Sequence, residues 1–190
     1  MCLLTDALPE TVQIEGKIYP IETDFRRWIE FSQLVFTNGA DAVVFTKMLA
    51  LIFKAKCPPI KIETLTVMLG FLNPFMVDTA TQGNGKKERS KIYDFDYDAK
   101  LIYASFLQQY SINLTRVSLH WWEFKALFDG LSEDTPFGKV LKFRCADISE
   151  IKDKKMQKYY RKMKNIYALP DNRTEKQKEL DLANDLGSLM

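Results

Sequence analysis

One histidine and three nearby acids are the residues of this chain whose types could perform acid–base chemistry. His120 is the only histidine in the sequence, Glu123 follows it by three positions, and Glu133 and Asp134 lie a short distance beyond. An imidazole changes charge near neutral pH, so a histidine beside carboxylates can act as a general acid or base. Such a site also needs a nucleophile or a second titrating group that converges on the histidine, and the sequence contains no GxSxG or cysteine-based nucleophile motif.

The spacing around His120 favours a structural or interface role over catalysis. On a helix spanning about residues 118–129, His120 lies on the same face as Phe124 and Leu127, at steps of four and seven. Glu123 is three residues away, so it can pair with the imidazole at the surface. We therefore expect replacement of His120 by glutamine to leave folding nearly intact.

The element that carries His120 has the pattern of a packed helix, a turn and a second helix. Its apolar residues follow steps of three and four, namely Trp121, Phe124, Phe128 and Leu131. Gly130 ends this helix, and the Thr-Pro pair at 135–136 is typical of the start of the next. Glu133 and Asp134 then belong to the turn between two helices and not to an active site.

A calcium-like spacing occurs farther upstream. Asp94, Asp96 and Asp98 begin like a calcium loop, but the sharp-turn glycine would fall at Ala99 and the bidentate glutamate at Ser105. Three acids also suit the positive end of a helix dipole. The pattern therefore predicts a solvated helix start and no calcium site.

Other cofactor patterns are incomplete. The Gly-Asn-Gly-Lys-Lys run at 83–87 lacks the first glycine of a phosphate loop and the Ser or Thr after the lysine. Cys2, Cys57 and Cys145 are far apart, without a CxxC pair and with one histidine in the chain, which predicts reduced thiols and no zinc site. We expect no metal and no cofactor.

The predicted fold is mainly α: a helical, bundle-like domain with a short N-terminal β-hairpin. Apolar alternation around Gly16 predicts the hairpin, because glycine is free to take positive φ in the turn. Helical periodicity and its start and stop signals predict the remaining elements. The hairpin spans 11–21, and helices span 24–36 behind a cap at Thr23 or Asp24, 41–54, 61–72, 94–110, 118–129, 135–145, and from between 147 and 153 to 167.

The chain divides by composition into four parts. Residues 1–77 hold the hairpin and three helices, 78–91 form a polar linker or loop, 92–170 form a second helical region, and 171–190 form a charged tail. One compact domain overall is an alternative to this division. The N-terminus has no signal sequence, and the most apolar stretch, 42–53, is too short to span a bilayer, which predicts a soluble intracellular protein without a membrane partner.

The segment 152–170 is strongly basic although the whole chain carries a net charge of only +2. Its basic residues alternate with Met and Tyr at helical steps, so it predicts an amphipathic helix. Three interpretations remain open: a helix docked on the core with a solvated basic face, a surface for a helical or acidic protein partner, and a nucleic-acid site. The candidate basic surface consists of Lys155, Lys158, Arg161 and Lys162. The charge balance of the whole chain argues against nucleic acid.

Several segments together resemble a family of tail assembly chaperones from long-tailed phages and prophages of Gram-positive bacteria. They are LLTDALPETVQIEGKIYPIETDFRRWIEF at 3–31, LIYASFLQQYSINL at 101–114, HWWEFKALFDGLSEDTPFGK at 120–139 and KDKKMQKYYRKMKNIYALP at 152–170. The resemblance implies a non-enzymatic protein of the host cytoplasm that binds the tape-measure protein and helps to recruit tail-tube subunits. It leaves homo-oligomer formation open.

The hypothesis places partner contacts on aromatic and methionine residues of the last two segments: Trp121, Trp122, Tyr159, Tyr160 and Met163. Two other functions remain alternatives. One is a structural tail or connector protein that stays in the virion. The other is a nucleic-acid-binding module that uses the basic helix.

Overall fold

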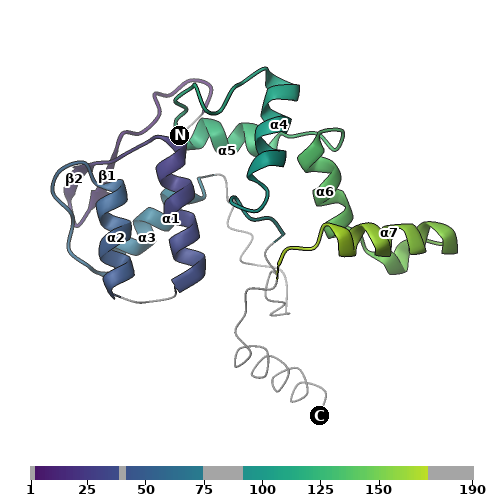
Figure 1. Cartoon of the computed structure of the whole chain (residues 1–190). Coiled ribbons are helices and arrows are strands. Elements are labelled where there is room, and N and C mark those ends of the chain that lie inside the picture. The colour runs from purple at the N-terminus through teal and green to yellow at the C-terminus, as the bar shows by residue number, and fades with distance from the viewer. Residues whose placement is uncertain (1–2, 39–41, 75–91, 171–190) are drawn as a thin grey trace, which may run out of the picture.

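The computed structural model describes residues 3–38, 42–74 and 92–170, and its fold is mainly helical with an N-terminal hairpin, as predicted (Figure 1). The elements of the first two described ranges are β1 (Thr11–Ile14), β2 (Lys17–Pro20), α1 (Phe25–Asn38), α2 (Ala42–Ile52) and α3 (Ile62–Leu72). Those of the third are α4 (Ala99–Tyr110), α5 (Trp121–Asp129), α6 (Pro136–Cys145), the short 3-10 helix η1 (Ile148–Glu150) and α7 (Lys154–Ile166). The predicted linker at 78–91 and the predicted tail at 171–190 lie outside the described residues.

The hairpin forms where the sequence pattern predicts it. β1 and β2 pair antiparallel around a two-residue turn in which both Glu15 (φ 49°) and Gly16 (φ 76°) take positive φ. Such turns match the right-handed twist of the two strands. Val12 and Ile14 point into the core, and β1 packs on α3, so the hairpin is stabilised by the helices beside it.

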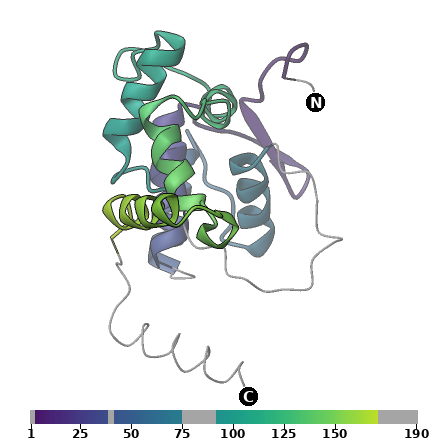
Figure 2. The same cartoon turned by 90° about the vertical axis from the view of Figure 1, so that its right-hand side faces the viewer.

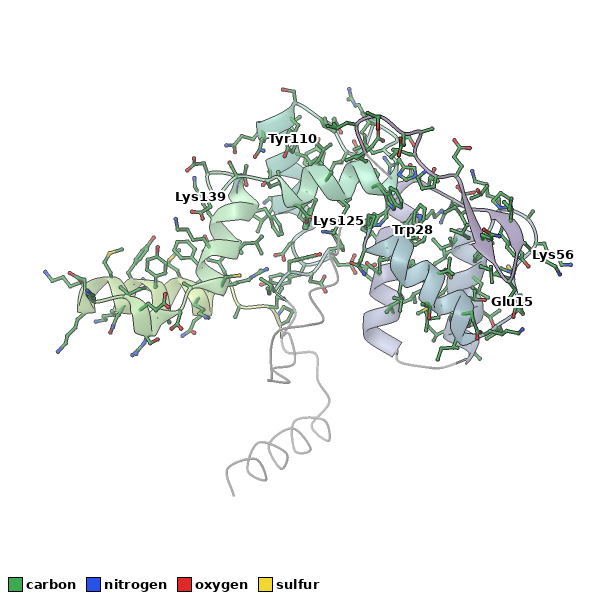
Figure 3. All side chains as sticks on the ribbon, turned by 180° about the vertical axis from the view of Figure 1, so that it is seen from behind. Glu15, Trp28, Lys56, Tyr110, Lys125 and Lys139 are labelled. Atoms are coloured by element: carbon green, nitrogen blue, oxygen red, sulfur yellow. The ribbon has the colours of Figure 1, made fainter. Side chains whose placement is uncertain are left out.

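One buried core joins the segments before and after residues 75–91. The rings of Phe25 and Phe124 are stacked with centroids 4.6 Å apart, and those of Trp28 and Trp121 are 6.4 Å apart. The indole Nε1 of Trp121 donates a hydrogen bond to the carbonyl of Leu72 at 2.9 Å. In Figure 3, Trp28 lies between the segment before residue 75 and the segment after residue 91, where α1 and α3 approach α5.

The starts of α1 and α5 are held together by backbone hydrogen bonds. Phe25 N–H donates to the carbonyl of Leu119 (3.1 Å), and Trp121 N–H donates to the carbonyl of Thr23 (2.7 Å). Asp24 caps α1, because its Oδ1 accepts from the N–H of Arg26 (2.9 Å). The residues just before α5 therefore lie in extended pairing with the start of α1, and this explains why α5 does not begin at residue 118.

The predicted start of α4 needs correction. The helix predicted from 94 begins at Ala99, because residues 95–98 form a turn, and Asp94 Oδ1 accepts from the N–H groups of Asp96 and Tyr97. The prediction of a solvated helix start is wrong for Asp98, whose side chain is fully buried.

Helix α7 lies apart from the main core. It packs on α6 and η1. In Figure 1 it crosses the lower end of α6 and reaches away from α1, α2 and α3, and in Figure 2 it lies in front of them. None of its residues is buried. In the described part of the chain, no helix has both the length and the apolar character needed to cross a membrane.

Candidate functional site

His120 is the N-cap of α5 and not a residue on its face. Its Nδ1 accepts a hydrogen bond from the N–H of Trp122 (3.1 Å), and Glu123 Oε2 accepts from the N–H of His120 (2.9 Å). This is a reciprocal capping box built with a histidine in place of the usual Ser or Thr. The predicted face shared with Phe124 and Leu127 is therefore wrong, because position 120 precedes the first helical residue.

The hydrogen bonds of His120 define its tautomer. Nδ1 accepts from a backbone N–H, so it carries no proton, and Nε2 lies 3.1 Å from the carbonyl oxygen of Pro9, which can only accept. Nε2 is therefore the protonated nitrogen and donates to Pro9. Both ring nitrogens are occupied by the backbone, which leaves this imidazole in a structural role.

Because His120 is an N-cap, its replacement should cost stability, and the expectation of nearly intact folding drawn from the sequence is revised. We expect His120→Gln to lower the free energy of unfolding by about 1 kcal/mol, because glutamine is a poor N-cap and cannot keep both bonds. His120→Asn should lose less, since asparagine is among the best N-cap residues. Urea unfolding of the two variants beside the wild type measures the difference. Equal stability of all three proteins would show that the cap contributes nothing.

The acids near the second turn lie far from His120. Glu133 follows the C-terminal end of α5 and His120 precedes its start, so the nine-residue helix separates them by about 13 Å along its axis. Glu133 Oε2 instead accepts from Lys142 Nζ at 2.5 Å. This hydrogen bond, with the carboxylate charge, raises the pKa of the Lys142 amine above its usual value. Glu133 and Asp134 lie in the turn before α6, as predicted.

The two predicted tryptophan contacts are part of the packed interior. Trp121 is 2% exposed, and Trp122 is half-buried with its Nε1 donating to the carbonyl of Phe71 at 2.9 Å. The Trp122 ring also lies against Phe71, with centroids 5.1 Å apart. Trp121 therefore has no surface to offer a partner in this conformation, and Trp122 has little. The stripe of Phe124, Phe128 and Leu131 packs in the core as predicted.

A buried ion pair holds the C-terminal helices together. Arg144 of α6 makes two hydrogen bonds to Asp98, from Nη1 to Oδ2 (2.6 Å) and from Nη2 to Oδ1 (2.8 Å). The side chains are 7% and 0% exposed. Arg144 Nε also donates to the carbonyl of Tyr167 (2.6 Å), and Nη1 donates to the carbonyl of Ile92 (3.1 Å). One guanidinium thus links the start of α4, residue 92 and the end of α7.

Helix α7 is capped and tethered at both ends. Asp153 Oδ1 accepts from the N–H groups of Lys155 (2.7 Å) and Met156 (2.9 Å). Gln157 Nε2 donates to the carbonyl of Ile151, and Lys164 Nζ donates to the carbonyl of Ala146. The side of α7 that carries Gln157 and Lys164 therefore faces η1 and the end of α6.

The apolar face of α7 is only partly covered. Phe143 of α6 is the ring on which it rests, with centroids 5.4 Å from Tyr160 and 5.9 Å from Tyr167. Tyr160, Met163 and Tyr167 are half-buried there. The outer edge of α7 consists of Met156, Tyr159 and Ile166, which are 46%, 48% and 55% exposed. Tyr159 also meets the ring of Phe143 edge-on, with centroids 5.9 Å apart, and about half of its surface remains exposed. Of the five predicted contact residues, Tyr159 is therefore the most exposed. The two tryptophans and the residues of α7 lie at separate sites on the molecule.

The predicted basic surface lies on the same helix. Lys155, Lys158, Arg161 and Lys162 are all exposed, and the sequence of α7 contains no acidic residue. Figure 3 shows α7 extending away from the rest of the molecule, with side chains on several sides of the helix. Helix α7 thus combines an incompletely covered apolar face with a continuous positive charge.

A shallow apolar hollow lies elsewhere, between α1, α4 and the segment before α5. Its volume is about 340 Å³, and its lining includes Phe25, Ile29, Ile102 and Phe124. Its one charged residue, Arg26, already donates to Asp24 and to the carbonyls of Leu114 and Val117. Among the described residues no group of three or more His, Cys, Asp or Glu side chains could hold a metal ion.

Comparison with protein-family models shows to which family the chain belongs. The model for bacteriophage Gp15 protein matches residues 4–169. The chain belongs to the bacteriophage Gp15 family. No curated protein and no solved structure matches it.

The Gp15 match covers the hairpin, α1 to α7 and Arg144, and it ends just before the charged tail. Arg144, the main organising residue of this region, is not among the residues predicted from the sequence. One signal was present: Phe137, Val140 and Arg144 follow steps of three and four, so the arginine lies on a buried stripe. A charge in that position requires a buried partner, but nothing local identifies Asp98 as that partner.

Proposed function

We propose that this Gp15-family protein is a non-enzymatic tail assembly chaperone that binds the tape-measure protein in the cytoplasm of the host bacterium. The proposal rests on the exposure of the outer edge of α7. In this phage protein, that apolar surface is not covered by the protein's own core. The segments that resemble tail assembly chaperones all lie within or next to the family match at 4–169.

The physical need for such a chaperone follows from its partner. A tape-measure protein is a very long helical chain with apolar stripes and no core of its own, so it aggregates when those stripes are exposed. A small helical protein can cover them through helix-in-groove contacts. Many weak sites along one long partner give avidity, and tail-tube subunits can still displace each contact.

Co-expression with the tape-measure protein tests the proposal. We expect more tape-measure protein in the soluble fraction and a complex that survives affinity purification through a tag on this chain. Mass spectrometry of purified virions should not detect the chain, because a chaperone leaves the finished tail. If no complex forms and the solubility of the tape-measure protein does not rise, the proposal is wrong. Stoichiometric amounts of this chain in the virion would favour a structural tail or connector protein.

A second candidate function is nucleic-acid binding by the basic surface of α7. Its four exposed cations, Lys155, Lys158, Arg161 and Lys162, favour it. A salt-dependent mobility-shift assay with duplex DNA distinguishes the two functions. Binding that collapses between low and moderate salt supports phosphate contacts, and no shift at low salt removes this candidate.

A further inference from the structure

The structure points to the partner chemistry of α7: we infer that its outer edge docks an acidic amphipathic helix, and this inference rests on the proposed chaperone function. The outer edge, Met156, Tyr159 and Ile166, is about half exposed. Methionine and tyrosine supply adaptable contact area for helical partners. Helix α7 has 13 residues, so it offers a contact about 20 Å long, which matches three to four turns of a partner helix.

Charge is placed beside the apolar residues in a way that specifies the partner. Lys155 lies one turn before Tyr159, and Lys162 lies one turn before Ile166 and three residues after Tyr159. The two lysines therefore border the outer edge along its length. A helix that lays its apolar stripe on this edge would bring residues of its own flank against them, and Asp or Glu at that flank would pair with both lysines.

The opposite border of the apolar face is already occupied. Gln157 and Lys164 bond to the carbonyls of Ile151 and Ala146, and Tyr160 and Tyr167 rest on Phe143. A partner can therefore approach from the lysine-bordered side. Arg144 and Lys164 anchor the C-terminal end of α7 while that side is open, so the helix is pre-ordered before the partner arrives.

Charge also disfavours a second copy as the occupant. Pairing two α7 helices would bring together six basic residues from each, since the helix from Lys154 to Ile166 has no acid to offset them. Like charges across an interface are strongly unfavourable. An acidic helix avoids this repulsion. It neutralises the basic residues of α7 while it covers the apolar outer edge.

Binding of the full-length chain to the tape-measure protein of the same phage tests this inference. Lys155→Glu/Lys162→Glu should weaken binding at least about tenfold by reversing the charge at the edge. Tyr159→Ser/Ile166→Ser should weaken it by about the same factor through lost apolar contact. The matched control Lys47→Glu/Lys56→Glu makes the same change in net charge at exposed lysines outside α7 and should bind within about twofold of the wild type.

Hydrogen exchange on the same complex identifies the occupant. The tape-measure segment that gains protection should carry Asp or Glu beside an apolar stripe, and binding should weaken as salt rises. Wild-type binding with unchanged affinity in both α7 variants overturns the inference but leaves the chaperone function standing. Failure of the wild-type chain to bind overturns both.

Three other results would also overturn the inference. One is a protected tape-measure segment without acids. Another is tighter binding of α7 to phosphatidylserine vesicles or duplex DNA than to the tape-measure protein. The third is α7 amides that are as protected in the free chain as in the complex, which would show that the chain's own tail or a second copy covers the edge.

Discussion

Replacing Arg144 by methionine should lower the free energy of unfolding by about 3–5 kcal/mol, because it leaves Asp98 as an unpaired charge in the interior. Asp98 is fully buried and receives two hydrogen bonds from Arg144, at 2.6 and 2.8 Å. The N–H of Asp94 also donates to Asp98 (3.1 Å), and this one bond cannot offset the lost cation. Urea unfolding followed by circular dichroism measures the loss as a shift of the midpoint.

Two further variants separate the buried charge from the lost side chain. Asp98→Asn/Arg144→Met removes both charges and should recover part of the stability, since an uncharged pair is cheaper to bury than a lone carboxylate. Arg116→Met removes an exposed arginine and should change stability by less than about 0.5 kcal/mol. If Arg144→Met changes the free energy of unfolding by no more than Arg116→Met does, the ion pair does not hold these helices together.

The same substitution should also loosen α7. Methionine cannot replace the hydrogen bond that Arg144 Nε donates to the carbonyl of Tyr167 at the end of that helix. Hydrogen exchange in α7 should therefore speed up in Arg144→Met more than in Arg116→Met, at a urea concentration where both proteins are folded. Unchanged exchange in α7 would limit the role of Arg144 to the contact between α4 and α6.

Gly138→Ala should destabilise the protein by about 3 kcal/mol or more, because no space exists for a side chain at that position. A Cβ there would lie 2.1 Å from the carbonyl oxygen of Ser132 and 2.9 Å from the Cα of Glu133. Both are backbone atoms of the turn that precedes α6. The N–H of Gly138 also donates to Thr135 Oγ1 (3.1 Å), so a shift of the helix start would break its cap.

Gly70 provides the matched control for this substitution. It lies in α3, where a Cβ would meet no atom within 4 Å. Gly70→Ala should stabilise the protein by about 0.5–1 kcal/mol, because alanine is the better helix former. Thermal or urea unfolding of both variants checks the opposite signs. A Gly138→Ala protein as stable as the wild type would mean that the turn at 132–133 does not approach α6 this closely.

Local pattern was sufficient for most elements. The hairpin turn, the caps at Asp24 and Thr135, and the helices α3, α6 and α7 were predicted within a few residues, because these features depend on residues close in sequence. The starts of α4 and α5 were predicted too early. Extended pairing of residues 118–120 with the start of α1 and the Asp94 turn are contacts that helical periodicity does not encode.

For the candidate surface too, some features could be predicted from the sequence and others could not. The sequence by itself determined that α7 is amphipathic and basic, because the steps of Met, Tyr and Lys follow the helical repeat. Only the tertiary structure decided that Trp121 is interior, that His120 is a cap, and that Tyr159 is the most exposed of the predicted contact residues. The reason is that burial depends on partners distant in the chain: Leu72 for Trp121, Pro9 for His120 and Asp98 for Arg144 are 49, 111 and 46 residues away.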